Sequence, residues 1–157
     1  MPTVLNIPEP TTAARAPMAS AQTNPANTGV EQPIVQITNL TKSVDTPTGP
    51  LNIINNISLA VRSGEYIMVY GRSGSGKTTL INAIAGLDRP SEGSIVVGGR
   101  DIAKMNDKEL SHYRMAALGI VYQDTNILDS LNVIKNVELP MTLANMPEER
   151  RRPQALK

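Results

Sequence analysis

Eight consecutive residues, from Gly71 to Thr78, combine glycines, a lysine and a hydroxyl in the arrangement of a phosphate-binding loop. In this P-loop pattern, glycines let successive backbone N–H groups curl around an anion. The ammonium of Lys77 suits the β- and γ-phosphates of a nucleotide, and the hydroxyl of Thr78 suits Mg²⁺. The sequence therefore predicts a nucleotide site with bound Mg²⁺, built from Gly71, Ser73, Gly74, Ser75, Gly76, Lys77, Thr78 and Thr79.

The same residues could instead form a Gly- and Ser-rich turn with an exposed lysine, but the flanking pattern argues against this alternative. Residues 65–70 form a short apolar run with hydrophobic side chains on both alternating faces, as in a buried parallel strand, which would place Tyr66 and Tyr70 in the core. From Lys77 onward, apolar residues recur at helical spacing, and Gly86 stands where a glycine commonly follows a helix end. Strand, loop and helix therefore follow in the order that a phosphate site needs.

Strands are predicted on both sides of this unit. The runs 34–40 and 51–61 are rich in β-forming residues, and we expect a loop at 45–50 because that window holds two prolines and a glycine. The pair Gly98-Gly99, between β-rich runs, is typical of a type I′ hairpin. A further short strand is expected at 119–122.

Three later segments are predicted to be helical. Asn106 and Glu109 have the spacing of a capping box, which predicts a helix that runs to about residue 117. A second helix is expected at 130–138, ended by Pro140. A third begins near Pro147, and its three arginines, Arg150, Arg151 and Arg152, are expected to form a solvated face.

Composition excludes several classes of function. The 157 residues hold 15 Lys and Arg against 14 Asp and Glu, a net charge of +1, so no strong field attracts nucleic acid or an anionic membrane. The absence of cysteine excludes disulfide scaffolds, thiol nucleophiles and zinc knuckles, and a single histidine leaves little for a metal site. No apolar run is long enough to span a membrane and no secretory signal is recognisable, so a cytoplasmic protein is expected.

The start of the chain differs in composition from the rest. Residues 1–32 are rich in Pro, Ala and Thr and carry few charges, which predicts a disordered tail. The remaining length, 33–157, suffices for one α/β domain and not for two.

The residues around the P-loop resemble the ATP-binding cassette of ABC transporters, and the resemblance covers roughly residue 34 to the end. It rests on Leu59-Ala60-Val61-Arg62-Ser63-Gly64-Glu65-Tyr66 before the loop and on Gly86-Leu87-Asp88-Arg89-Pro90-Ser91-Glu92-Gly93 after it. Further along, Val121-Tyr122-Gln123-Asp124, Asn126-Ile127-Leu128 and Asn136-Val137-Glu138-Leu139-Pro140 resemble the Q-loop of that family. Within that family, the sequence is most similar to the lipoprotein-releasing and macrolide-exporting subgroup.

This resemblance implies an α/β P-loop NTPase fold with a RecA-like core, an antiparallel β subdomain and the start of a helical subdomain, present here in truncated form. It assigns 33–157 to the N-terminal part of an ABC ATPase domain, with the P-loop at about 71–79, the Q-loop at about 123–129 and the start of the helical subdomain at about 130–157. The implied function is to bind Mg·ATP and power transport through separate membrane-spanning subunits. The implied partners are those subunits and a second cassette, at the inner face of the plasma membrane.

The resemblance also assigns two residues outside the P-loop. The Q-loop glutamine of the family reaches the Mg²⁺ and the attacking water. The resemblance assigns the same role to Gln123. An aromatic residue that stacks on adenine usually precedes the second strand in the family, but the matching stretch Thr41-Lys42-Ser43-Val44 offers Val44. Because base stacking is worth roughly 1–3 kcal/mol, we expect weaker and less base-selective binding.

Other motifs of the family do not occur in this chain: the Leu-Ser-Gly-Gly-Gln signature, a Walker B strand ending in Asp-Glu, and the switch histidine. His112 precedes the Q-loop and is expected to face solvent. ATP hydrolysis by this chain is therefore left open. One alternative is a self-contained small P-loop kinase in which Asp124 holds Mg²⁺, and another is a nucleotide-binding remnant without turnover.

Overall fold

The structure, a computed structural model, describes residues 3–6, 32–124 and 126–157. The chain divides into two units, Met1–Leu110 and Ser111–Lys157, and each is described by itself. Across the described residues, no helix is both long and apolar enough to cross a bilayer.

The larger sheet of the first unit is antiparallel, with the strand order β3-β2-β5-β6. Its strands are β2 (Val35–Thr46), β3 (Gly49–Val61), β5 (Glu92–Val97) and β6 (Arg100–Asp101). Gly98 and Gly99 both have positive φ, as the predicted type I′ hairpin requires. This sheet confirms the antiparallel β subdomain of the predicted fold class.

The predicted loop at 45–50 is wrong, because β2 and β3 form one long hairpin that turns at Pro47-Thr48. Asp45 pairs with Pro50 and Thr46 with Gly49. β3 lies at the edge of the sheet, where a proline costs no ladder hydrogen bond on the side that faces away. Pro50 is therefore compatible with a strand at this position.

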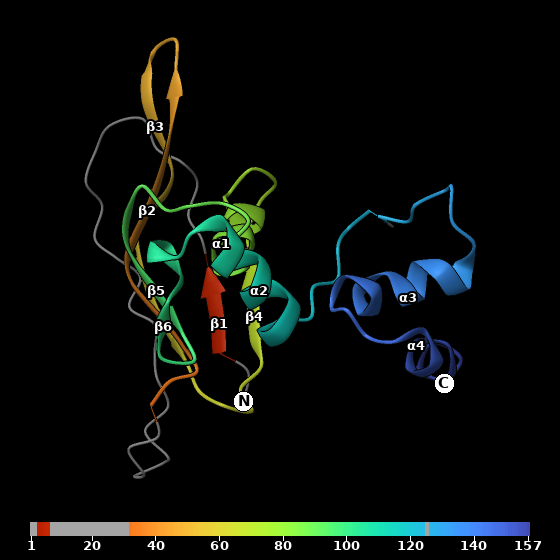
Figure 1. Cartoon of the computed structure of the whole chain (residues 1–157). Coiled ribbons are helices and arrows are strands. Elements are labelled where there is room, and N and C mark those ends of the chain that lie inside the picture. The colour runs from red at the N-terminus through yellow and green to blue at the C-terminus, as the bar shows by residue number, and fades with distance from the viewer. Residues whose placement is uncertain (1–2, 7–31, 125) are drawn as a thin grey trace. The chain divides into compact units, whose positions relative to one another are not determined.

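A second sheet carries the P-loop strand. β4 (Ile67–Tyr70) pairs in parallel with β1 (Thr3–Asn6), and the two strands run side by side (Figure 1). The structure differs here from the expected disordered tail, because residues 3–6 form a strand; residues 1–2 and 7–31 lie outside the described residues. After the loop comes α1 (Lys77–Ile84). Gly86 follows the end of this helix and has a left-handed conformation, as predicted.

The expected burial of the P-loop strand is wrong for one of its faces. Tyr66, Met68 and Tyr70 are 67%, 47% and 48% exposed as whole residues, so the two tyrosines do not belong to the core. Because the three residues are spaced by two, they share one face of the strand. Met68 and Tyr70 on that face are about half exposed.

The core of the first unit is aliphatic, as the scarcity of aromatic residues requires. It is built from Ile37, Leu40, Ile54, Leu59, Leu80, Ala83, Ala85, Ile95, Ile102, Met105 and Leu110. Leu80 and Ala83 are the buried residues of α1, so this helix is anchored on one face directly after the P-loop.

A short 3₁₀-helix η1 (Ile102–Lys104) leads to α2 (Asp107–Ala117). The predicted capping box is confirmed: the Asn106 backbone N–H donates to the Glu109 carboxylate at 2.9 Å, and the Glu109 N–H donates to the Asn106 side chain at 3.0 Å. The strand predicted at 119–122 is absent, and Val121 is 98% exposed. Without a neighbouring strand, a β-forming sequence has no ladder to join.

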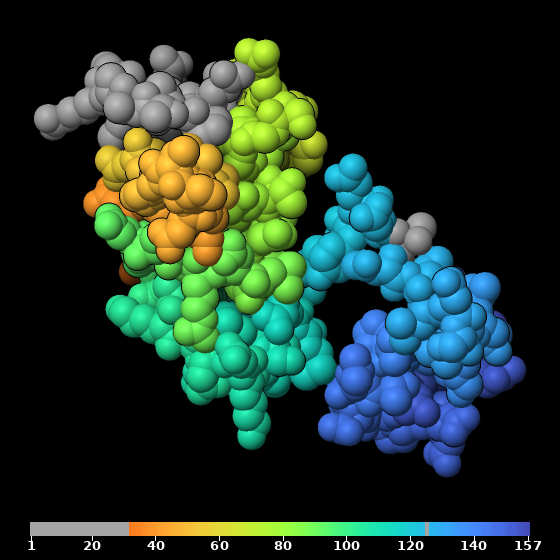
Figure 2. All heavy atoms as spheres, turned by 90° about the horizontal axis from the view of Figure 1, so that it is seen from above, coloured from red at the N-terminus to blue at the C-terminus, as the bar shows by residue number. Residues whose placement is uncertain are grey.

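In the second unit, α3 (Val133–Leu143) packs against α4 (Glu148–Ala155), and their side chains form a continuous surface in Figure 2. The prediction that Pro140 ends the helix is wrong. Pro140 removes one N–H donor, yet the helix continues, and Thr142 donates from Oγ1 to the Glu138 carbonyl at 3.0 Å. The helix predicted near Pro147 is confirmed.

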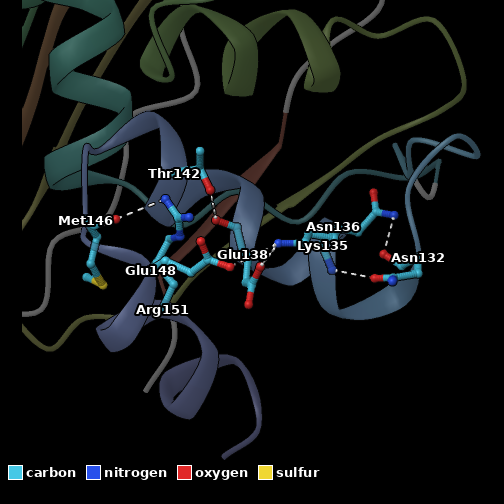
Figure 3. Close-up of polar contacts among 8 residues, drawn as sticks. All are labelled: Asn132, Lys135, Asn136, Glu138, Thr142, Met146, Glu148 and Arg151. Carbon is cyan, nitrogen blue, oxygen red and sulfur yellow. Dashed lines mark hydrogen bonds and ion pairs between the residues drawn. The ribbon is translucent and has the colours of Figure 1, made fainter.

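The predicted solvated arginine face of α4 is wrong for Arg151. Its guanidinium Nη1 donates to the Met146 carbonyl at 3.0 Å, and its Nε is buried (Figure 3). Arg151 therefore fastens the start of α4 to the preceding turn.

Candidate nucleotide-binding site

Six residues, 71–76, connect the end of β4 to the start of α1. Gly74 has a φ of +81° and Gly76 a φ of +86°, a region that L-residues rarely adopt. The chain can therefore wind tightly between strand and helix at these two glycines.

The two glycines have different surroundings. A Cβ atom on Gly76 would lie 2.8 Å from the carbonyl oxygen of Ile53, so this end of the loop rests against the backbone of β3. A Cβ atom on Gly74 would meet nothing within 4 Å. The loop is thus fixed at Gly76 and has open space at Gly74, where a ligand can approach the backbone.

The beginning of α1 is suited to an anion. Gly76 is its N-cap, with no side-chain cap, and the first turn holds no acidic residue. Unpaired N–H groups at a helix start carry partial positive charge. The arrangement can therefore hold phosphate oxygens without competition from a neighbouring carboxylate.

Lys77 folds back over the loop. Its ammonium Nζ donates to the carbonyl oxygens of Gly71 at 3.0 Å and Arg72 at 2.6 Å, and lies 3.4 Å from Ser75 Oγ. These contacts place a full positive charge within the loop. A phosphate bound there would replace these carbonyls as the acceptor of hydrogen bonds from the three N–H groups of the Lys77 ammonium.

The remaining residues of the predicted site divide by exposure. Ser75 is buried, and its backbone N–H donates to the Arg72 carbonyl at 3.2 Å, so it helps to shape the loop. Ser73 and Thr78 are exposed, and Thr79 is half-buried. The structure brings all of the predicted P-loop residues together in one strand–loop–helix segment.

Val44, the expected adenine-contacting position, does not lie in a loop. It belongs to β2, is half-buried and pairs with Leu51 of β3. The expected position before the second strand is therefore part of a long hairpin arm. The next pair along that hairpin, Ser43 and Asn52, is joined by a side-chain hydrogen bond of 2.8 Å.

Gln123 and Asp124 lie between α2 and α3 and belong to the second unit. Both are exposed, and so is His112 on α2, as predicted. Over the described parts of the chain, no group of three or more His, Asp or Glu residues is arranged to hold a metal ion.

Sequence reasoning missed an ionic bracket behind the P-loop helix. Lys42 of β2 donates through Nζ to Asp88 Oδ1 at 2.5 Å and to the Arg89 carbonyl at 2.8 Å. Arg89 in turn donates to the Met105 carbonyl at 3.1 Å and to Asp107 Oδ1 at 3.0 Å. The bracket ties the residues after α1 to β2 and to the start of α2. No local sequence pattern predicts the pairing of Lys42 with Asp88, because the two residues are 46 positions apart in the chain.

The segment just before α3 is held in place by the side chain of Asn136. Its side chain accepts from the Leu128 N–H at 2.9 Å and donates to the carbonyl of Leu131 at 3.0 Å. Asn132 caps α3 by accepting from the Lys135 N–H at 2.9 Å (Figure 3). The stretch that follows Gln123 is therefore held onto α3 by side-chain to backbone bonds.

Comparison with known proteins gives consistent matches. A family model described as "ABC transporter" matches residues 54–157. The bacitracin export ATP-binding protein BceA of Halalkalibacterium halodurans is 36% identical over 116 residues, 74% of this chain and 46% of the relative. The macrolide export ATP-binding/permease protein MacB of Sodalis glossinidius is 34% identical over 78% of this chain and 19% of its own length.

A solved structure has the same fold. It is described as a dimeric post-hydrolysis state of the ATP-binding cassette MJ0796 bound to ADP and Pi, and it superimposes with a TM-score of 0.73 at 34% identity. The match covers 78% of this chain and 54% of that cassette. This chain thus spans about half the length of the BceA relative and of the solved cassette.

Proposed function

Because the chain belongs to the ABC transporter family, we propose that it is the ATP-binding part of a transporter and holds Mg·ATP at the P-loop, residues 71–79. The observation that carries the proposal is the contrast between Gly76 and Gly74. The first is pressed against β3 and the second opens onto free space at the start of an uncapped helix. This is a cradle that a side chain would fill and a phosphate fits.

Each P-loop residue then has a role that its chemistry supports. Backbone N–H groups of the loop would hold the β- and γ-phosphates, and Lys77, which now donates to the loop carbonyls, would donate to phosphate oxygens instead. The Thr78 hydroxyl would hold Mg²⁺, which would supply positive charge against the phosphates. The family resemblance assigns Gln123, in the Q-loop at 123–129, to the same ion and the attacking water.

The partners of the whole protein follow from its family. We propose that this chain pairs with a second cassette and acts on membrane-spanning subunits, which places it at the inner face of the plasma membrane. The cassette MJ0796 is dimeric in its solved structure, which supports the first of these partners. The second unit, from residue 111, then holds the beginning of the helical subdomain, expected at about 130–157.

Within the family, we propose the subgroup of macrolide exporters. The similarity to the MacB protein of Sodalis glossinidius supports this assignment. The lipoprotein-releasing members of the predicted subgroup have the sequence resemblance alone as support. Assays of cargo should therefore begin with macrolides.

Titration calorimetry of Mg·ATP against the parent chain and Lys77→Ala tests the binding proposal. We expect at least about a tenfold loss of affinity, the scale of a charged hydrogen bond of roughly 1.5–3 kcal/mol. Lys104→Ala is the matched control, because Lys104 is an exposed lysine of the same unit, paired on the surface with Asp101. Equal ATP affinity for all three folded proteins would overturn the proposal.

A further inference from the structure

The two strands of the β2–β3 hairpin are not evenly paired. Their register shifts three times, between Ile37 and Leu40, between Leu40 and Lys42, and between Lys42 and Ser43. At each shift, one strand holds an extra residue that has no counterpart on the other, as in a β-bulge. Because bulges bend a hairpin, they set the path of this one, which extends beyond β5 (Figure 1).

Two asparagines with left-handed backbone form the first two bulges. Asn39 has a φ of +50° and Asn56 a φ of +51°, in the region that asparagine enters more readily than most residues. The Asn39 N–H donates to Ser58 Oγ at 2.9 Å. The Asn56 N–H donates to Thr41 Oγ1 at 3.1 Å. A hydroxyl of the opposite strand therefore satisfies each backbone group that the bulge turns out of the ladder.

The first bulge is also held from the other side, by β5. A Cβ atom on Gly93 would lie 2.5 Å from the carbonyl oxygen of Asn39 and 2.6 Å from that of Thr38. A glycine is therefore required for β5 to approach the bulge this closely. The close fit fixes the place of the bend along the hairpin.

The third bulge consists of Ile53. Between the pairs made by Lys42 and Ser43, β3 holds one residue more than β2, and that residue is Ile53. Its carbonyl oxygen is the one that would lie 2.8 Å from a Cβ atom on Gly76. The P-loop therefore rests against the residue that this bulge displaces from the ladder.

The bulged part of the hairpin meets α1 at both ends of the helix. Ile53 lies against Gly76, which is the N-cap. Lys42, beside the same bulge, donates to Asp88 Oδ1 and to the Arg89 carbonyl, shortly after the helix ends. A change in the path of the hairpin would therefore act on the P-loop and its helix together.

We propose that Asn39 and Asn56 are positioning residues of the nucleotide site. Their bulges direct the hairpin so that the Ile53 carbonyl supports the P-loop at Gly76 and keeps its backbone in the form that holds phosphate. This inference rests on the proposed function, because it concerns the same phosphate cradle. A cradle that is already ordered costs less to bind to, so the bulges raise the affinity for Mg·ATP.

The first test needs no nucleotide. A β-branched residue rarely adopts left-handed backbone, so Asn56→Val should remove its bulge and draw Ile53 away from Gly76. The urea midpoint should then fall less when Gly76→Ala is added to Asn56→Val than when it is added to the parent. Asn56→Gly is the matched control, because glycine keeps the left-handed backbone and with it the full effect of Gly76→Ala. Equal shifts in all three backgrounds would overturn the proposal.

Thr41→Val takes the place of Asn56→Val if the latter does not fold. It removes the hydroxyl that accepts from the Asn56 N–H and keeps a β-branched side chain at position 41. We again expect a smaller effect of Gly76→Ala, and an unchanged effect would again count against the proposal.

The second test measures the affinity of the folded proteins for Mg·ATP by calorimetry. We expect Asn39→Val and Asn56→Val to bind severalfold more weakly than the parent, and Asn39→Gly and Asn56→Gly to bind as tightly. Asn145→Val controls for backbone strain alone, since Asn145 has a φ of +57° in the turn after α3 and should leave the affinity unchanged.

The outcomes of this test separate the two proposals. If the parent binds Mg·ATP and the two valine variants of the hairpin bind it equally well, the positioning role is refuted. A parent that does not bind Mg·ATP would refute the proposed function, while the first test would still decide whether the bulges support the P-loop.

Discussion

The Cα of Gly76 faces the carbonyl oxygen of Ile53 so closely that a methyl group on it would lie 2.8 Å from that oxygen. This oxygen belongs to the backbone of β3, so it cannot move aside as the end of a flexible side chain would. This contact couples the P-loop to the hairpin that precedes it. The glycine requirement at this position is therefore steric as well as conformational.

Alanine at the two loop glycines should separate these effects. Both Gly74→Ala and Gly76→Ala place an L-residue at positive φ, at a cost of about 1–2 kcal/mol. Gly76→Ala adds the clash with β3, so we expect a further loss of about 1–3 kcal/mol in the free energy of unfolding. Urea unfolding of both variants measures the difference. If the Gly74 variant were the less stable one, the proposed contact with Ile53 would not be important.

Val44→Tyr tests whether the β2 arm approaches the base of the nucleotide. A tyrosine there would offer a stacking surface, and we expect ATP to bind about 5-fold or more tighter. Inorganic triphosphate has no base and should gain nothing. Calorimetry with the two ligands makes the comparison, and an equal gain for both would place the base elsewhere.

Turnover by the 157-residue chain should not exceed that of Lys77→Ala. Phosphoryl transfer to water needs groups that orient the water and stabilise charge in the transition state, and the sequence offers Gln123 without the other motifs of its family. Phosphate release measured with excess Mg·ATP checks this. Robust hydrolysis that Asp124→Asn abolishes would instead favour the small kinase-like alternative.

The bracket between Lys42 and Asp88 should contribute modestly to stability. The Lys42 side chain is 18% exposed and that of Asp88 is 40% exposed, so solvent screens part of the attraction. A double-mutant cycle with Lys42→Met and Asp88→Asn should give a coupling free energy of about 1 kcal/mol. A coupling near zero would mean that the Arg89 carbonyl, and not the ion pair, accounts for the effect of Lys42.

The buried carboxylate of α3 should respond asymmetrically to loss of its ion pair. Glu138 is 2% exposed and lies 3.1 Å from Lys135 Nζ, and in the described part of the chain neither carboxylate oxygen accepts a hydrogen bond (Figure 3). Lys135→Met leaves this charge unpaired, and we expect a loss of about 1–2 kcal/mol, reduced from the fully buried case because Lys135 is 45% exposed.

Glu138→Met is the matched variant, because it removes the buried charge at similar volume and leaves an exposed lysine. We expect it to be neutral or stabilising. Thermal unfolding of the two variants gives the order of stability. The opposite order would show that Glu138 stabilises α3 by more than its pair with Lys135.

Several features of this protein follow from short stretches of sequence. The P-loop, the capping box of Asn106 and Glu109, the Gly98-Gly99 hairpin and the glycine after α1 were all predictable. Each is encoded within about eight residues, where the allowed backbone angles and the local hydrogen bonds leave few alternatives. The family resemblance rests on the same kind of local information.

Contacts between distant segments decided the rest. The pairing of β1 with β4, the bond from Lys42 to Asp88 and the approach of Ile53 to Gly76 join residues that no local pattern connects. Burial is non-local in the same way: the sequence of β4 is apolar on both faces, but exposure of Tyr66, Met68 and Tyr70 depends on which elements cover them. Likewise, Pro140 ends a helix by local rules, yet α3 continues through it to Leu143 and packs against α4.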